Sequence, residues 1–380
     1  MHTQEANHRT EPRASTTFER AERPEYRESL RLLHLRGVSV SGAAHASPAK
    51  YHKAATRFKF CGSSVRLNEW ADNSTGEVKQ TFAGGRLCGQ RLCPKCQHIK
   101  ARILCDQIGK VHKRHLEEAP DSIGVLLTLT MRNCEPSQLR SAVQDMHHAF
   151  GKLRRRVEFE TSVRGFFRAT EITISKASGS RMYHPHMHVM LMVPRAYLRK
   201  SSGMFITQER WVQMWQDCLG VDYRPIVDVR AVTPEAMANR KGRKGGALTM
   251  AGAIREVAKY CVKPDGYQEI LASGRFWTDP AVFQELQEGL RSLRLYAWGG
   301  QLDVIRKELQ LKDVESGEID LEAELENVEK PPQNYRLIAQ VVYNWDDDAR
   351  GGWGDYVELF RRDIAEGVDI LNESRFRGGG

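Results

Sequence analysis

Residues 183–193 predict a β-strand, in which histidines alternate with other residues up to His188 and an apolar run follows. Because successive side chains of a strand point to opposite faces, His186 and His188 share one face with Met190. Two imidazoles side by side on a mostly apolar strand suit a metal ion held by two neutral nitrogens. The alternative is a pair of histidines at the rim of a sheet. The spacing of two residues, with His184 beside the pair, favours the metal site.

A second strand is predicted over residues 164–174, which are rich in aromatic and β-branched side chains. The polar, Gly-containing segment between the two strands predicts a turn. The resulting hairpin places Glu171 opposite His186 or His188, on the same face of the sheet. One carboxylate and two imidazoles fit Mg²⁺ or Mn²⁺, although the geometry does not exclude Zn²⁺. A register slip of one residue would turn Glu171 away, and His184 is then the substitute ligand.

The remaining periodicity predicts an α+β fold. Further strands are expected over residues 122–131 and 225–230, and residues 335–345 fit either a strand or a helix. Helices are expected over residues 100–115, 136–159, 207–219, 253–263, 279–290 and 302–311. These elements predict an antiparallel sheet with helices packed on one face, and with the helix at 253–263 over the open face.

The cysteines predict a small metal-binding module. Four of the eight lie in or near a Cys-x-x-Cys motif, and the expected zinc ligands are Cys61, Cys88, Cys93 and Cys96. Tetrahedral zinc needs four such ligands, and a short hairpin-rich segment cannot otherwise bury a core. Scattered buried thiols are the alternative. His98 and Cys105 are the other candidates for the fourth ligand in place of Cys61.

The charge indicates the kind of partner. The formal net charge is +9 over 380 residues, which favours a polyanion, most simply nucleic acid, over a membrane surface. The apolar runs are too short to span a bilayer and the polar N-terminus shows no signal peptide, so a cytoplasmic protein is expected. Candidate phosphate-binding residues are Arg91 and, in a Gly-rich loop, Arg240, Lys241, Arg243 and Lys244. An ordinary solvated loop explains the last four equally well.

A second group of candidate catalytic residues lies on the predicted helix 253–263, which ends at Pro264. Glu256, Tyr260 and Lys263 are spaced i, i+4 and i+7, so they share one face of the helix. A carboxylate, a phenol and an amine in one stripe are typical of an active site. A surface salt-bridge stripe explains the helix alone equally well, but the predicted metal strand favours the catalytic interpretation.

In chain order, these motifs resemble the HUH-type rolling-circle replication initiator (Rep) proteins of small bacterial plasmids, in the group with a Glu and a Tyr on the active-site helix. The resemblance covers roughly residues 57–315. It rests on the cysteine motif, the strand Leu127–Thr130, the motif His184–His188 and the helix segment Glu256–Lys263. A His-x-His motif alone is weak, whereas the combination is specific. The resemblance implies an HUH endonuclease fold with a ferredoxin-like or RRM-like palm.

The resemblance also implies a reaction. Such a protein binds its double-strand origin and nicks one strand, with Tyr260 as the nucleophile and Tyr267 as a spare candidate. The 5′ end stays on the enzyme as a phosphotyrosine, the free 3′-OH primes replication, and the DNA is rejoined or released at termination. The phosphodiester energy is kept in the tyrosyl ester, and the sequence has no Walker loop. A host helicase and the replication machinery are therefore expected partners, and a homodimer is an open alternative.

The roles of the other site residues follow from the same resemblance. A cation on the two histidines and the glutamate polarises the scissile phosphate and neutralises its developing charge. Lys263 stabilises the phenolate or the phosphate. Glu256 acts as a general base that activates a water in the terminating cleavage, so a second tyrosine is not required.

Two kinds of rival protein account for part of the pattern. An HUH transposase or a relaxase-like nickase shares the chemistry, but in relaxases the tyrosine typically precedes the His-x-His motif. A zinc-bearing DNA-binding regulator without catalysis explains the charge and the cysteines and leaves the Glu, His and Tyr motifs unexplained. The expected organisation is a disordered segment 1–50, a zinc module 51–110, a nuclease domain 111–275, a helical region 276–345 and a flexible tail 346–380.

Overall fold

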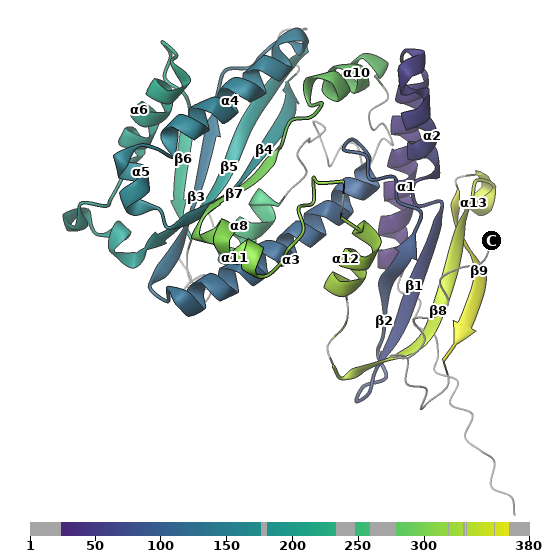
Figure 1. Cartoon of the computed structure of the whole chain (residues 1–380). Helices are drawn as coiled ribbons and strands as arrows, with labels where there is room; N and C mark the ends of the chain where they lie inside the picture. Colours follow the sequence, from purple (N-terminus) through teal and green to yellow (C-terminus); the bar gives the residue numbers. More distant parts are fainter. Residues whose placement is uncertain are drawn as a thin grey trace, which may run out of the picture.

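The computed structural model describes residues 24–175, 181–232, 248–258, 279–317, 319–329, 331, 333–352 and 354–364. These residues contain two antiparallel sheets. The sheets lie on either side of the long helix α3 (Pro94–Glu118), as Figure 1 shows. Helix α3 begins at the cysteine motif beside the smaller sheet and leads into the larger one, so a single rigid element connects the two parts.

The larger sheet has the strand order β6, β3, β5, β4, β7, and every neighbouring pair is antiparallel. Its strands are β3 (Ser122–Thr130), β4 (Gly165–Ser175), β5 (Met182–Pro194), β6 (Val227–Ala231) and β7 (Tyr296–Gly300). Strand β5, which carries the histidine motif, lies at the centre of the sheet. A central strand is held by hydrogen bonds on both sides, so its side chains are placed with little freedom.

Helices cover both faces of the larger sheet. On one face, Met187 and Leu191 of β5 belong to a core with the indoles of Trp211 and Trp215. The helices on this face are α4 (Leu139–Leu153), α5 (Val157–Ser162) and α6 (Gln208–Leu219). Over the other face lie α3 and α8 (Met250–Val257), and Met190 belongs to the core on that side. The predicted α+β class with an antiparallel sheet is confirmed.

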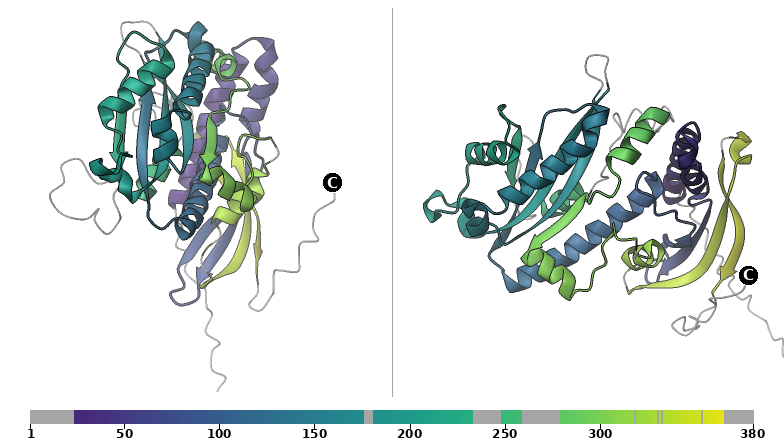
Figure 2. Two further views of the ribbon diagram at one scale, coloured as in Figure 1. Left: turned by 60° about the vertical axis from the view of Figure 1, so that its left-hand side comes forward. Right: turned by 45° about the horizontal axis from the view of Figure 1, so that its top comes forward.

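The smaller sheet joins segments that are far apart in the sequence. Its order is β2 (Val78–Gly85), β1 (Ser64–Asp72), β8 (Tyr335–Asp346) and β9 (Asp355–Asp363), again antiparallel throughout. The helices α1 (Pro24–His45), α2 (His52–Phe60) and α12 (Leu321–Glu329) pack around it (Figures 1 and 2). The end of the chain therefore completes the module that the cysteines begin.

This arrangement differs from the expected division of the chain in three places. Within 1–50, residues Pro24–His45 form α1, whose Val40 and Ala44 are fully buried. Within 276–345, β7 and β8 are strands of the two sheets, and within 346–380 the segment Asp355–Asp363 is strand β9. The strands acquire their order from partners distant in sequence, which local periodicity does not report, whereas α1 packs mainly on the neighbouring helix α2.

Cap residues fix the ends of the helices near the candidate site. The Thr249 hydroxyl accepts from the Gly252 amide at 3.1 Å and starts α8. The Asp279 carboxylate accepts from the Ala281 amide at 2.9 Å and starts α10 (Pro280–Gly289). Arg181, just before β5, donates to Asp279 at 2.8 Å. Helix α10 is thereby attached to the strand that carries the histidines.

The remaining elements are short. They are η1 (Ala49–Tyr51), η2 (Pro136–Gln138), η4 (Arg195–Leu198), η5 (Lys200–Ser202), α11 (Gln301–Glu308) and α13 (Ala349–Gly352). Of the helices in the described part of the chain, none combines the length and the apolar character that a membrane crossing requires.

Candidate active site and cysteine cluster

Glu171, His186 and His188 meet on one face of the larger sheet. Glu171 is the register partner of His186 in the β4–β5 pair, so the two side chains point the same way. The Glu171 Oε2 atom lies 3.3 Å from His186 Nε2 and 3.2 Å from His188 Nε2. One ligand atom from each residue falls within 4.8 Å of the others. This spacing is close enough for a single cation to be shared.

The Nδ1 atom of each imidazole contacts an oxygen atom of the protein. His186 Nδ1 lies 3.3 Å from the His184 carbonyl oxygen, and because a carbonyl can only accept, Nδ1 carries the proton. His188 Nδ1 lies 3.1 Å from the hydroxyl of Thr128 on β3. In His186 this leaves Nε2 with a free lone pair facing Glu171, which is the tautomer that a metal ligand needs.

Helix α8 brings a second carboxylate to this face. Glu256 Oε1 lies 3.8 Å from His188 Nε2, and the Glu256 side chain is 29% exposed, compared with 3% for Glu171. Ala253 and Val257 of α8 are fully buried, so the apolar side of the helix is fixed to the molecule. The site therefore combines a buried carboxylate, two imidazoles and a partly accessible carboxylate.

His184 has a different environment. Its Nδ1 lies 2.8 Å from the Asn133 side-chain oxygen, and burial, followed by the nearby His186, lowers the pKa of its imidazole. It does not belong to the group of ligand atoms formed by the glutamate and the other two histidines. The β4–β5 register thus brings Glu171, rather than His184, to the pair.

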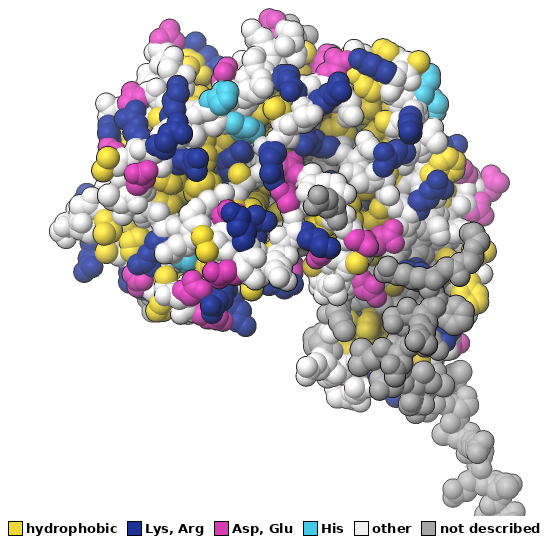
Figure 3. Space-filling view, in the orientation of Figure 1, with side chains coloured by type: hydrophobic (Ala, Val, Ile, Leu, Met, Phe, Trp, Pro, Cys, Tyr) yellow, Lys and Arg dark blue, Asp and Glu magenta, His cyan; other side chains and the backbone are white. Residues whose placement is uncertain are grey.

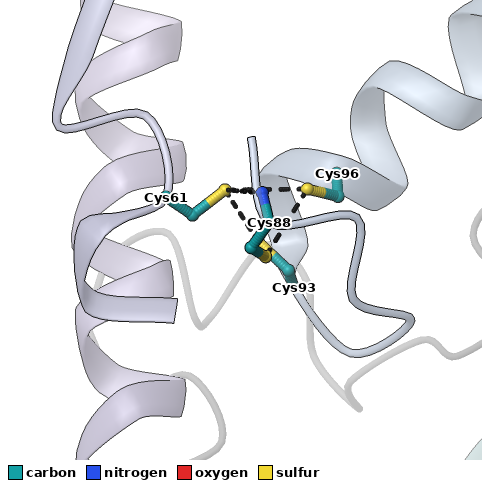
Figure 4. A group of neighbouring side chains, drawn as sticks. All are labelled: Cys61, Cys88, Cys93 and Cys96. Atoms are coloured by element: carbon teal, nitrogen blue, oxygen red, sulfur yellow. Dashed lines mark hydrogen bonds between the residues drawn. The ribbon is translucent and has the colours of Figure 1, made fainter. Parts of the chain in front are cut away.

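Four cysteines form a compact cluster in Figure 4. Cys61 follows α2, Cys88 lies in a loop after β2, and Cys93 and Cys96 flank the first turn of α3. The Sγ atoms of Cys61 and Cys96 are 3.6 Å apart, those of Cys88 and Cys96 3.7 Å, and those of Cys61 and Cys93 3.5 Å. Four thiolates at zinc–sulfur distances of about 2.3 Å have sulfurs about 3.8 Å apart, so the cluster fits a tetrahedral ion.

The surroundings of the cluster also suit thiolates. The Gly89 amide donates to Cys96 Sγ at 3.2 Å and the Cys88 amide to Cys61 Sγ at 3.4 Å. Hydrogen bonds from the neighbouring thiols hold the pKa of Cys96 well below its usual range, whereas burial raises the pKa of Cys93. The buried ammonium of Lys95 lies beside the cluster, and burial lowers its pKa to about 8, which keeps it protonated at neutral pH.

The comparison with known proteins decides the family. The model of the replication protein family matches residues 79–352, which is most of the chain. The chain belongs to the replication protein family. Its relatives named Protein rep include one from Streptococcus pneumoniae, 31% identical over 69% of this chain and 74% of the relative. The relative from Bacillus amyloliquefaciens is 34% identical over 71% of this chain and 77% of its own length. The relative from Lentilactobacillus hilgardii is 31% identical over 77% of this chain and 85% of its own length.

Membership of this family confirms the resemblance to Rep initiators that the motifs predicted. No solved structure shows a significant match to the chain. The matched region runs from β2 to the end of α13, so it includes the whole larger sheet and, of the smaller one, β8 and nearly all of β2.

Several predicted site residues of this Rep family member lie outside the described residues. They are Tyr260, Lys263, Tyr267, Arg240, Lys241, Arg243 and Lys244. Of the predicted DNA contacts, only Arg91 is described. Its guanidinium donates to the Leu293 carbonyl at 2.6 Å and lies 3.2 Å from Glu315, so it ties the cysteine loop to the segment that follows α10. As the fourth ligand of the cysteine cluster, the structure places Cys61 beside Cys88, Cys93 and Cys96. The alternatives His98 and Cys105 are not in this group.

Two contributing residues were not identified from the sequence. Thr128 lies in the predicted strand motif, and its contact with His188 follows only from the β3–β5 register. Lys95 lies between two cysteines, where a lysine is ordinarily solvated. Its burial depends on acceptors from distant parts of the chain, including the Tyr356 hydroxyl at 3.0 Å and the Cys61 carbonyl at 3.0 Å.

Proposed function

We propose that this Rep family member initiates rolling-circle replication of a plasmid by nicking one strand of its double-strand origin. The observation that carries the proposal is the convergence of Glu171, His186 and His188 beneath the helix that bears Glu256. Tyr260 follows Ala258, the last described residue of this region, by two positions. Two residues span about 7 Å at most, so the phenol has a short tether to the site.

The donor set supports a divalent cation at this site. Glu171 and the two imidazoles offer one oxygen and two nitrogens, and the Nδ1–H group of His186 is bound to a carbonyl, which leaves Nε2 for the ion. A set of this kind fits Mg²⁺ or Mn²⁺, and when bound such an ion polarises the scissile phosphate and offsets its added negative charge.

In the proposed reaction, Tyr260 supplies the nucleophile. A phenol has a pKa of about 10, so it needs help to react at neutral pH. The phenolic oxygen forms a bond to phosphorus, the bond from phosphorus to the 3′ oxygen breaks, and the phenolic proton leaves as the new bond forms. The departing oxygen takes up a proton and becomes the 3′-OH primer. Lys263 would stabilise the phenolate or the phosphate, and Tyr267 is the reserve candidate.

Glu256 has the position of a general base near the same ligands. Its carboxylate is partly exposed, unlike Glu171, so water can reach it. In the proposed terminating cleavage it takes a proton from a water, whose oxygen then bonds to the scissile phosphorus in place of a second tyrosine. The bond from phosphorus to the 3′ oxygen breaks, and the departing oxygen takes up a proton.

The cysteine cluster would hold zinc with a structural role, since all four thiols are buried and their sulfur atoms lie within 4.8 Å of one another. The proposal also includes the replicon's DNA as partner, a host helicase and the replication machinery, acting in the cytoplasm. The loop residues Arg240, Lys241, Arg243 and Lys244 stay predicted phosphate contacts.

The proposal is tested on a supercoiled plasmid that carries the gene and its flanks, with Mg²⁺ or Mn²⁺ added. The expected product is the relaxed circle, formed by the wild-type protein and not by Tyr260→Phe, while both proteins bind the plasmid equally. A wild-type protein that binds DNA without nicking it in either metal would instead support the zinc-bearing regulator.

A further inference from the structure

A groove of about 900 Å³ lies where the cysteine loop, the start of α4 and the end of α10 meet. Its lining includes five basic side chains, Lys50, Arg91, Lys100, Arg140 and Arg291, and two acidic ones, Glu288 and Glu315. In Figure 3, Lys and Arg side chains gather on the face where α10, α2 and the start of α3 adjoin in Figure 1. We propose that this groove binds the phosphate backbone of duplex DNA beside the nick site, an inference that rests on the proposed function.

The basic side chains of the groove are not equivalent. Arg91 is held by backbone carbonyls and Glu315, and Lys50 lies 2.6 Å from Glu288. Lys100 donates to the Gly89 carbonyl at 3.1 Å, and a carbonyl carries no net charge. Arg291 forms no ion pair with any residue that the structure describes. Lys100 and Arg291 therefore keep charges that phosphate oxygens can complement.

Arg140 extends the basic surface along α4. One of its guanidinium nitrogens donates to the Arg291 carbonyl at 2.6 Å, which places the two arginines next to each other. This contact leaves the charge of Arg140 uncompensated by a carboxylate among the described residues. Two neighbouring arginines and a lysine across the groove suit a line of phosphates better than a single small anion.

The groove is mechanically coupled to the candidate active site. Helix α10 forms one wall, and Glu285 of the same helix accepts from Arg181 at 2.9 Å and from the Tyr183 hydroxyl at 2.6 Å. Tyr183 is on β5, directly before His184, whose side chain contacts Asn133 in the segment leading to α4. DNA held in the groove would thus have a fixed relation to the histidines, which a nicking enzyme needs.

The lining favours duplex DNA over single-stranded DNA. Proteins that hold single strands stack the bases on exposed aromatic rings. Among the described residues that line the groove, the one aromatic side chain is Tyr51, which is 7% exposed. Its ring packs edge-on against Phe283 at 5.6 Å, and its hydroxyl donates to Glu288 at 2.6 Å. The described part of the lining therefore offers no stacking platform, while its charges suit a phosphate backbone.

The test compares two double variants with the same change in charge. The groove variant is Lys100→Gln with Arg291→Gln. The control is Lys110→Gln with Arg114→Gln, which are about half exposed on the same α3 helix. They lie roughly 15 and 21 Å farther along the helix axis than Lys100. Binding of a short fluorescein-labelled duplex and of a labelled oligo-dT is measured by anisotropy over a range of salt concentrations, and the metal content of each variant is checked.

The groove variant is expected to bind the duplex about tenfold more weakly, with the slope of log K against log salt reduced by about two, one for each lost phosphate contact. The control should stay within about twofold of the wild type, and oligo-dT binding should be unchanged in both variants. Equal duplex affinity in the groove and control variants would overturn the inference. Plasmid nicking is scored separately, so a failure of the proposed function stays distinguishable from a failure of the groove.

Discussion

At the residue scale, the chemistry of the candidate site depends on which nitrogen of each histidine carries the proton. His186 and His188 present Nε2 to the same Glu171 oxygen, and their Nδ1 atoms contact a carbonyl and a hydroxyl. The outer partners thus orient the imidazoles, and their loss should weaken a bound cation even though they do not touch it. Thr128 is the outer partner that can be changed without altering the backbone.

Thr128→Val is expected to lower the affinity for Mn²⁺ by about 10- to 100-fold, because the imidazole of His188 loses the group that orients it. Isothermal titration calorimetry measures the change. The matched control is Thr130→Val on the same strand, since the Thr130 hydroxyl donates to the Ile226 carbonyl and not to a histidine. Equal affinity in the two variants would show that Thr128 does not support the site.

Exchanging the carboxylate distinguishes the two candidates for the third ligand. Glu171→Gln is expected to abolish measurable Mn²⁺ binding, because a neutral amide replaces the buried anion that faces both imidazoles. His184→Gln should bind the ion nearly as well as the wild type, since its ring nitrogen is already engaged by Asn133. The reverse order of affinities would assign the third ligand to His184.

At the element scale, the two ends of the chain complete the cysteine module. Strand β8 pairs with β1 and strand β9 with β8, and α1 packs against α2, α3 and β9. The Lys95 ammonium, between the cysteines, donates to the Tyr356 hydroxyl on β9 at 3.0 Å. The cysteine cluster and strand β9 are therefore parts of one folding unit.

Tyr356→Phe should lower the free energy of unfolding by about 1–3 kcal/mol, because the buried Lys95 loses an acceptor and the Gly62 carbonyl loses a donor. Urea titration followed by circular dichroism gives the value. Tyr335→Phe on the neighbouring strand β8 is the control, because its hydroxyl contacts Lys79 in a partly exposed position. A similar cost in both variants would contradict the special role of Tyr356.

Acidification is expected to release metal from the cysteine cluster. Burial raises the pKa of the Cys93 thiol, so without metal this thiol is protonated at neutral pH, and binding must displace the proton. The affinity for zinc should therefore fall as the pH falls, by up to about tenfold per pH unit for each proton displaced. A competition titration with a chromophoric chelator at several pH values measures this slope, and an affinity independent of pH would contradict it.

The sequence predicts pairing between neighbouring strands better than pairing between strands that are far apart in the chain. The alternation around His186 and the hairpin turn predict that Glu171 faces the histidines, because both signals are contained in neighbouring residues, but only the observed register excludes a slip of one residue. Strand β9 could not be predicted in the same way, since its partner is β8 and the sheet begins with β1 near the other end of the chain. Strand β9 lies at the edge of its sheet and is exposed along most of its length, so its side chains show no regular alternation of buried and exposed positions.

At the scale of the whole molecule, α3 joins the two sheets and contributes both to the cysteine cluster and to the packing around the Glu and His site. Its first turn supplies Cys93 and Cys96, and its later turns pack beside α8. Helix α10 makes a second link, through Arg181 to β5 and through the Arg91 contacts of the following segment to the cysteine loop. Metal binding in one part should therefore influence DNA handling in the other.

Substitution of a ligand of the proposed zinc site provides a test of this link. Cys96→Ser is expected to lose the metal, to unfold the smaller sheet and to reduce duplex binding, because the cysteine loop also forms one wall of the basic groove. Mn²⁺ binding at the histidine site should persist, since Glu171, His186 and His188 come from the larger sheet alone. Loss of Mn²⁺ binding in this variant would contradict the separation of the two metal sites.

Tyrosine-linked nicking is tested by identifying the peptide that becomes covalently linked to DNA. The protein is mixed with the supercoiled plasmid and Mn²⁺, the SDS-resistant adduct is isolated, and nuclease and protease digestion is followed by mass spectrometry. We expect a nucleotide on the phenolic oxygen of Tyr260. An adduct on Tyr267 would move the nucleophile, and the absence of any adduct during active nicking would contradict tyrosine-linked catalysis.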